Sequence, residues 1–230
     1  MKNITFKNYD PQSINDIVFA SGKGESLVKD IVSGAFPFPF GGKTGILFYG
    51  PPGTGKSALA TLLPDAMEMV RTGYPSDFNY FPITPGANGM TVLANIQTQA
   101  QFIPFSSHHY FVLDEVDNLT AQAMTILKSV MNTRHSIFVM TTNHLNQIDQ
   151  AVQDRCHCIP FLAAAAQKWL PLAHRMLANA GISTISDQML INVIDPCNGS
   201  ARKIIDALTC MILMTKRNAK GTGIQNTVVV

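Results

Sequence analysis

The chain contains 230 residues, which is enough for one domain or two small ones with a buried core. Charged residues make up 14% of the chain, against roughly 25% in an average soluble domain, and the formal net charge is only +2. This composition excludes a disordered chain and disfavours a protein that binds nucleic acid through bulk positive charge. No apolar run is long enough for a membrane span, and the amino end lacks the apolar stretch of a signal peptide.

Four irregularly spaced cysteines do not form a disulfide framework, so we expect structural, reduced thiols. The spacing Cys156-x-Cys158 also differs from that of zinc sites. The composition as a whole therefore predicts an intracellular protein, cytoplasmic or, in a eukaryote, nuclear.

Strand and helix patterns alternate along the first part of the chain. In order, we expect a strand at 45–49, a helix at 56–70, strands at 78–83 and 110–113, a helix at 121–131 and a strand at 137–140. Such alternation predicts a parallel sheet with helices on its faces.

Helical patterns dominate after residue 160, where we place a domain boundary. We expect helices at 163–180, 186–194 and 201–216. The prediction is an α/β domain over 1–160 and a small all-helical domain over 161–230. The last ten residues, GTGIQNTVVV, are expected to form a flexible tail.

A phosphate-loop motif follows the first predicted strand. Residues 50–57 read GPPGTGKS, a complete G-x4-G-K-[ST] pattern between an apolar strand and a helix. Glycines let backbone N–H groups curl around phosphate oxygens, and the helix amino terminus adds partial positive charge. Lys56 would reach the β- and γ-phosphates, and the Ser57 hydroxyl would bind Mg²⁺. We therefore expect ATP and Mg²⁺ at Gly50, Pro51, Pro52, Gly53, Thr54, Gly55, Lys56 and Ser57; the alternative is an accidental glycine turn.

Two adjacent carboxylates, Asp114 and Glu115, end the strand at 110–113. Ligands of open α/β sheets bind at the carboxyl ends of the strands, beside the phosphate loop. Asp114 would hold the Mg²⁺ shell, and Glu115 would orient and activate the attacking water. A solvated acidic turn is the plainer alternative.

The strand at 137–140 ends in Thr141, Thr142 and Asn143. Polar side chains at this edge could contact the γ-phosphate and the attacking water. Of the three we favour Asn143, with ordinary strand-end capping as the alternative.

Together these residues resemble the AAA+ ATPases, and within them the clamp-loader group: the small subunits of replication factor C and their bacterial and viral relatives. The resemblance runs from about residue 14 to residue 208. It rests on LFYGPPGTGK at 47–56 and LDEVDNLT at 113–120. Asp154-Arg155-Cys156 stands where clamp loaders carry Ser-Arg-Cys, and GSARK at 199–203 resembles their lid motif.

The resemblance implies an oligomeric ATPase with shared sites. Arg155 would act in trans on ATP bound by the neighbouring subunit, where it would neutralise charge in the transition state. Arg202 would touch the γ-phosphate in cis, which would relieve its conflict with the dipole at the start of a helix. Solvated or ion-paired arginines are the alternatives.

Three departures from the clamp-loader pattern stand out, and one is Asp154 in place of the serine beside Arg155. This chain ends where their helical collar domain would begin, and TPGANG at 84–89 replaces an acidic, polar stretch. We therefore expect a clamp-loader-like ATPase without a collar that remodels or loads a partner on DNA. The alternatives are a DNA-bound regulator or helicase-loader filament, and an AAA+ switch that controls a partner protein without DNA.

The expected partners are further subunits, as a homo- or hetero-oligomer, a protein such as a clamp, helicase or effector, DNA, and no membrane. A small-molecule kinase is disfavoured because it has no use for the acidic pair followed by Asn143, Arg155 and Arg202. DNA contact rests on scattered basic residues, which could equally be solvated. The candidates are Lys23, Lys29, Lys43, Lys128, Arg134, Lys216, Arg217 and Lys220.

Overall fold

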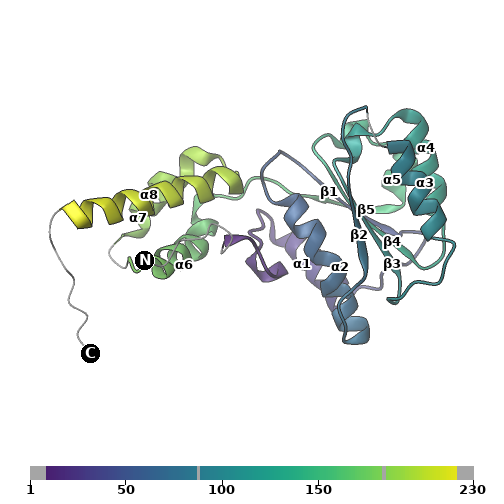
Figure 1. Ribbon diagram of the computed structural model, residues 1–230, viewed down its shortest axis with the longest axis horizontal. Helices are drawn as coiled ribbons and strands as arrows, with labels where there is room; N and C mark the ends of the chain where they lie inside the picture. The colour runs from purple at the N-terminus through teal and green to yellow at the C-terminus, as the bar shows by residue number, and fades with distance from the viewer. Residues whose placement is uncertain (1–8, 87–88, 183–184, 222–230) are drawn as a thin grey trace. The chain divides into compact units, whose positions relative to one another are not determined.

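The computed structural model describes residues 9–86, 89–182 and 185–221, with side chains up to residue 218 (Figure 1). The chain divides into two compact units, one over Pro11–Leu162 and the other over residues 163–221 with residues 9 and 10. The predicted boundary at 160 lies two residues before this division. The predicted flexible tail lies, apart from Gly221, outside the described residues.

The larger unit contains a parallel sheet of five strands in the order β2-β3-β4-β1-β5. The strands are β1 (Gly45–Tyr49), β2 (Phe78–Pro82), β3 (His109–Asp114), β4 (Ser136–Thr142) and β5 (Cys156–Pro160). The predicted fold class is confirmed, and the four predicted strands match β1 to β4 within about two residues. The fifth strand, β5, was not predicted; it pairs with β1 at the sheet edge.

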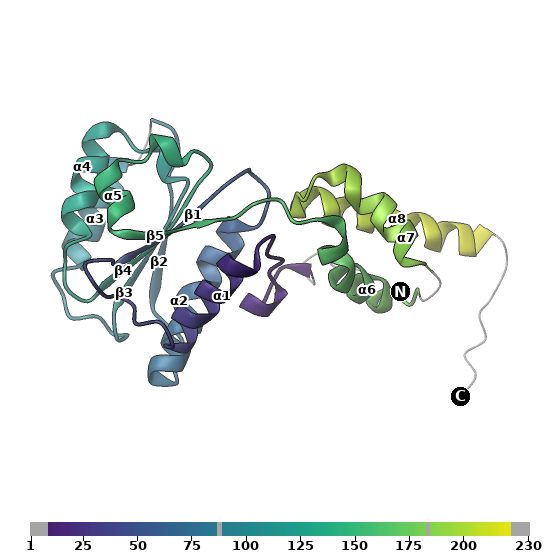
Figure 2. The ribbon, with the colours of Figure 1, turned by 180° about the vertical axis from the view of Figure 1, so that it is seen from behind.

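Helices cover both faces of the sheet (Figures 1 and 2). On one face lie α1 (Gly22–Ser33) and α2 (Lys56–Thr72); on the other lie α3 (Gly89–Gln99), α4 (Ala121–Val130) and α5 (Gln150–Asp154). Short 3-10 turns occur at η2 (Ile14–Asp16), η3 (Val116–Asn118) and η4 (Leu145–Gln147). The sequence did not predict α3, because turn residues open it and its buried side chains are few: Val92, Leu93 and Ile96.

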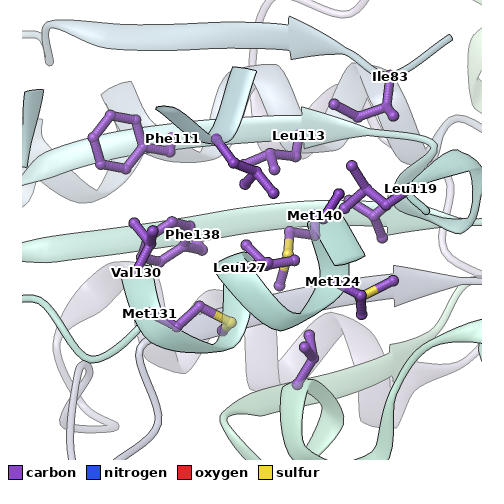
Figure 3. Close-up of a cluster of buried hydrophobic side chains, with 14 of the residues drawn as sticks. Ile83, Phe111, Leu113, Leu119, Met124, Leu127, Val130, Met131, Phe138 and Met140 are labelled. Carbon is purple, nitrogen blue, oxygen red and sulfur yellow. The ribbon is translucent and has the colours of Figure 1, made fainter. Parts of the chain in front are cut away.

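Successive side chains of the central strands point to opposite faces of the sheet and form two hydrophobic cores. All seven residues of β4 are buried, as expected for a strand with neighbours and helices on every side. Its Phe138 and Met140 pack under α4 with Phe111 and Leu127, as Figure 3 shows. Side chains of the opposite parity, such as Val139, join the core under α1 and α2. These cores fix the strand ends that carry the site.

The smaller unit is helical, as predicted. It contains η5 (Ala166–Trp169), α6 (Leu170–Asn179), α7 (Asp187–Ile194), η6 (Asp195–Cys197) and α8 (Ala201–Gly221). The predicted helix at 163–180 begins later, since Pro171 occupies the first turn of α6 and residues 163–165 are not helical. Trp169 is buried, and its indole Nε1 donates to the Ala164 carbonyl at 3.3 Å. None of the helices within the described ranges has the length and apolar character that a bilayer crossing requires.

Candidate nucleotide-binding site

The predicted phosphate loop joins β1 to α2. Gly50, Gly53 and Gly55 have φ values of 146°, 79° and 107°. Residues with a side chain adopt such conformations only with strain, whereas glycine adopts them readily. A Cβ on Gly50 would also run into the carbonyl oxygen of Phe161. The 17-residue helix α2 begins at Lys56, so the N–H groups of its first turn have no intrahelical acceptors and face the loop. Residues 50–57 thus form a cradle of backbone donors.

Lys56 is held inside this cradle with only 6% of its surface exposed. Its Nζ donates to the carbonyls of Gly50 and Pro51, both at 2.8 Å, and to Oδ1 of Asn143 at 2.9 Å. Thr54 closes the loop by donating to the Pro51 carbonyl at 3.0 Å. The structure therefore brings together Lys56 and Asn143, which the sequence located separately.

Asp114 lies opposite Ser57 at the end of β3. Its Oδ1 accepts hydrogen bonds from Ser57 Oγ at 2.8 Å and from Thr141 Oγ1 at 2.5 Å. Its Oδ2 accepts one from the Tyr80 hydroxyl at 2.8 Å. Burial, together with the hydrogen bond to Asp114, raises the pKa of Tyr80 to about 12. The sequence did not indicate these contacts of Tyr80 and Thr141 with Asp114, because they depend on strand register.

Glu115 follows Asp114 in a strained backbone conformation. Its φ of 60° is left-handed, which is uncommon for a non-glycine residue and occurs often at functional sites. Its N–H donates to Thr141 Oγ1 at 3.0 Å. Asn118, in η3, donates through Nδ2 to Glu115 Oε2 at 3.3 Å and to the Ile83 carbonyl at 2.9 Å. Asn118 thus links the exposed carboxylate of Glu115 to the end of β2, a role that the sequence analysis missed.

The loop and the facing oxygens fit a nucleotide triphosphate with Mg²⁺. Backbone N–H donors and a buried ammonium group suit phosphate oxygens. Mg²⁺ prefers oxygen ligands and is usually held by one or two protein groups together with the phosphates of a nucleotide. The Ser57 hydroxyl and the Asp114 carboxylate, 2.8 Å apart, supply such a pair.

Arg155 lies at the opposite end of the strands from the phosphate loop, where β1 and β5 begin. Its carbonyl accepts hydrogen bonds from the N–H groups of Thr44 and Gly45, at 3.1 and 3.0 Å, where β1 begins. The phosphate loop begins where β1 ends, five residues further on. At roughly 3.3 Å per residue, the strand separates the two by about 16 Å. The structure therefore does not bring Arg155 together with the phosphate loop of its own chain.

Arg202 is the second residue of α8 in the helical unit, and its side chain is exposed.

Several basic residues considered for DNA contact are engaged within the chain. Lys29 pairs with Glu25 at 2.7 Å, and Lys128 pairs with Asp149 at 3.1 Å. Lys43 donates to two backbone carbonyls. Lys23, Arg134 and Arg217 are exposed, Lys216 is half-buried, and the side chain of Lys220 lies outside the described residues. Of the seven candidates with described side chains, four are nevertheless exposed: Lys23, Lys29, Arg134 and Arg217.

Comparison with known proteins identifies a family and several relatives. Residues 46–162, a little more than half of the chain, match the family described as "ATPase family associated with various cellular activities (AAA)". Replication factor C small subunit 2 of Pyrobaculum islandicum is 26% identical over 207 residues, which cover 88% of this chain and 62% of the relative. Replication factor C small subunit of Methanocella arvoryzae is 27% identical over 216 residues, which cover 91% and 63%. The chain thus spans about three fifths of the length of these relatives.

Solved structures show the same fold at lower identity. The Thermotoga maritima RuvB Holliday junction branch migration motor matches with a TM-score of 0.68 and 14% identity, covering 92% of this chain and 68% of that one. PCH-2 of C. elegans matches with a TM-score of 0.60 and 15% identity, covering 91% and 73%.

Proposed function

The chain belongs to the AAA family of ATPases, and on this premise we propose that it hydrolyses ATP at the β1–α2 loop, in an oligomer, to remodel or load a partner on DNA. The observation that carries the ATPase assignment is the meeting of Lys56, Ser57, Asp114, Glu115 and Asn143 at one edge of the sheet. The similarity to replication factor C small subunits supports the clamp-loader type of work.

Each residue of the site has a chemical task in hydrolysis. Lys56 and the backbone N–H groups of the loop bind the phosphates, and Ser57 and Asp114 would hold Mg²⁺. Mg²⁺ bound there supplies positive charge to the phosphate oxygens. The Glu115 carboxylate orients a water molecule and accepts its proton. Asn143, which accepts a hydrogen bond from Lys56, contacts the γ-phosphate and so senses whether it is present.

Arg155 supports a site shared between subunits. An arginine that neutralises charge on the transferred phosphoryl group accelerates hydrolysis by about 10³- to 10⁵-fold. Because β1 separates Arg155 from the loop of its own chain, Arg155 serves a neighbouring subunit. For Arg202, the role on the γ-phosphate in cis is supported by the resemblance of GSARK at 199–203 to the clamp-loader lid motif.

Mixing two inactive variants tests the shared site. Lys56→Ala abolishes hydrolysis in its own subunit, and Arg155→Ala removes the arginine from its neighbour. Each variant alone is expected to lose most ATPase activity, and the mixture should recover part of it, because wild-type Arg155 then faces a wild-type loop at some interfaces. Steady-state phosphate release measures the recovery. A mixture as inactive as its components would contradict the shared site.

A protein partner is supported by the segment between α3 and β3. Phe102, Ile103 and Phe105 are 69%, 92% and 100% exposed, and such adjacent large apolar side chains mark protein contacts. The same exposed apolar side chains favour a second candidate function: an ATP-dependent switch that acts on a protein without DNA.

DNA response separates the two candidates. For a clamp-loader-like protein, ATPase activity should rise several-fold with primed DNA over duplex or single-stranded DNA, and size measurement in ATP should show an oligomer. An identical rate with and without every DNA would favour the protein switch.

A further inference from the structure

We propose that Lys43 is a positioning residue for Arg155: it holds the backbone on both sides of the arginine so that the side chain is presented to the neighbouring subunit. The inference rests on the proposed trans-acting role of Arg155. It adds a residue that neither the phosphate-loop motif nor the acidic pair contains.

Lys43 contacts the backbone that flanks Arg155. Its Nζ donates to the carbonyl of Asp154 at 3.0 Å and to the carbonyl of Cys156 at 2.6 Å. The carbonyl between them, that of Arg155, accepts the N–H groups of Thr44 and Gly45. Three consecutive carbonyls are therefore bound by three consecutive residues, and the Arg155 backbone cannot shift without breaking several hydrogen bonds.

Residues 43–45 also help to position the groups that bind the Arg155 side chain. Arg155 Nε donates to Asn132 Oδ1 at 2.9 Å, and one terminal nitrogen donates to the Ala151 carbonyl at 2.7 Å. Asn132 directly follows Met131, whose carbonyl accepts a hydrogen bond from Thr44 Oγ1 at 2.9 Å. A guanidinium group has five N–H donors, so it can be held at two and still meet a phosphate with others.

Lys43 is itself fixed by a tight turn. The N–H and carbonyl groups of Phe40 and Lys43 exchange hydrogen bonds of 3.2 and 3.0 Å. Gly41 and Gly42 between them have φ values of 61° and 79°, as a two-residue type I′ turn requires. The Lys43 side chain therefore starts from a rigid backbone.

Close packing at Gly45 makes the arrangement stiff. A Cβ on Gly45 would lie 2.6 Å from Cys156 Sγ and 2.8 Å from Met131 Cε, the neighbours of Arg155 and Asn132. The Asp154 carboxylate, which could compete for the arginine, accepts a hydrogen bond from Gln150 Nε2 at 2.9 Å instead. The site thus orients Arg155 with its charge available to a neighbour.

An asymmetric mixture tests this role. In a mixture of Lys56→Ala and Arg155→Ala subunits, hydrolysis occurs only where a Lys56→Ala subunit supplies its arginine to the loop of an Arg155→Ala subunit. Adding Lys43→Met to the Lys56→Ala subunits should lower kcat of the mixture by about ten- to a hundred-fold with KM for ATP unchanged, because misplacement by about 1 Å has effects of that size. Adding it to the Arg155→Ala subunits should leave both constants unchanged.

Conservative and matched variants complete the design. Lys43→Arg in the arginine-supplying subunit should recover most of the activity, since its guanidinium group can donate to both carbonyls. Lys29→Met, which removes a lysine paired with Glu25 on α1, should change nothing in either subunit. Should Lys43→Met melt at a lower temperature than the parent chain, Lys43→Gln provides a milder loss of donors at the same position.

Different outcomes reject different claims. Equal losses with Lys43→Met in either subunit, or no loss in the arginine-supplying subunit, would overturn the positioning role and leave the trans-acting arginine intact. No recovery in the parent mixture of Lys56→Ala and Arg155→Ala would instead reject the shared site, and the role of Lys43 would fall with it.

Discussion

The residues around Asp114 and Glu115 show how neighbouring side chains orient a reactive carboxylate. Asp114 is bonded by Ser57, Thr141 and Tyr80, whereas the exposed Glu115 carboxylate accepts its described hydrogen bond from Asn118. Asn118 Nδ2 also donates to the Ile83 carbonyl, so the side-chain amide is held in place by a second hydrogen bond. Asn118 is therefore expected to hold Glu115 in position for the attacking water.

Asn118→Ala should lower kcat about ten-fold with little change in KM for ATP. A loss of this size corresponds to about 1.4 kcal/mol of transition-state stabilisation, a usual contribution for one hydrogen bond to a charged group. Steady-state ATPase measurements on the oligomer give both constants. Asn192→Ala, at an exposed asparagine of α7, is the matched control and should retain activity. A rise in KM at unchanged kcat would show that Asn118 acts on nucleotide binding instead.

At the scale of elements, β5 sets the position of Arg155, although the sequence did not predict this strand. Its sequence Cys-His-Cys-Ile-Pro covers only five residues and ends in proline, so it lacks the apolar run of a central strand. Pairing with β1 in the register Gly45↔Cys156 sets where Arg155 lies. The side chains of Cys156 and Met131 leave little room for a side chain at position 45.

Gly45→Ala should lower the free energy of unfolding by about 1–3 kcal/mol, as expected for overpacking a buried site. The added methyl group would meet Cys156 Sγ and Met131 Cε well inside van der Waals distance. Gly22→Ala, at the start of α1, is the control, because a Cβ there meets nothing within 4 Å; it should be neutral or slightly stabilising. Urea unfolding of both variants measures the difference. Equal stabilities would show that β5 adjusts without cost.

At the scale of the whole molecule, a polar network joins α2 to the segment before β3. Glu68 accepts hydrogen bonds from the Ser107 backbone at 2.6 Å, from the Ser107 hydroxyl and from the Tyr110 hydroxyl at 2.8 Å. Burial acts to raise the pKa of Glu68, but these hydrogen bonds outweigh it and leave the pKa below its ordinary value. Arg71 donates to the Tyr110 hydroxyl, to the Phe38 carbonyl and to Nδ1 of a half-buried histidine, His108.

His108 makes stability depend on pH. Burial, followed by the charges of Arg71 and His135, lowers the pKa of His108 from 6.5 to about 4, although Glu68 opposes the shift. Between these values the unfolded chain binds a proton that the folded chain does not, so the free energy of unfolding should fall as pH falls from about 6.5 to 4. Glu68 acts in a lower window: its contribution is present above its ordinary pKa of 4.5 and is lost as pH falls below it.

His108→Asn should flatten this pH dependence, because asparagine keeps an acceptor for Arg71 and does not titrate. The difference between the wild type and the variant isolates His108 from His157, whose pKa is also lowered, by burial and by Lys43. We expect the wild type to lose on the order of 1 kcal/mol more than the variant between pH 7 and pH 5, measured by urea unfolding. Parallel curves would show that His108 titrates alike in both states.

Those parts of the fold and the site that depend on contiguous residues could be predicted from the sequence. The phosphate loop, the acidic pair and strands β1 to β4 were located because each is a local pattern of apolar residues, glycines or charges. The sequence did not predict the contacts of four residues of the structure, because each contacts a residue that is distant in sequence and is brought near by strand pairing or a turn. These residues are Tyr80, Thr141, Asn118 and Lys43. In the sequence, the segment around Phe105 is indistinguishable from an ordinary loop, because only the structure shows that its apolar side chains are exposed.

The sequence by itself determined that this protein has a phosphate loop on a parallel α/β sheet, because strand, loop and helix are consecutive and their residues specify the backbone. Only the tertiary structure decided that Arg155 lies at the other end of the strands from the phosphate loop. Lys56, Asp114 and Glu115 meet at the carboxyl ends of the strands, whereas Arg155 lies at the amino end of β1, held there by residues 43–45. The reason is physical: long-range pairing between β1 and β5, rather than any local pattern, sets the position of Arg155.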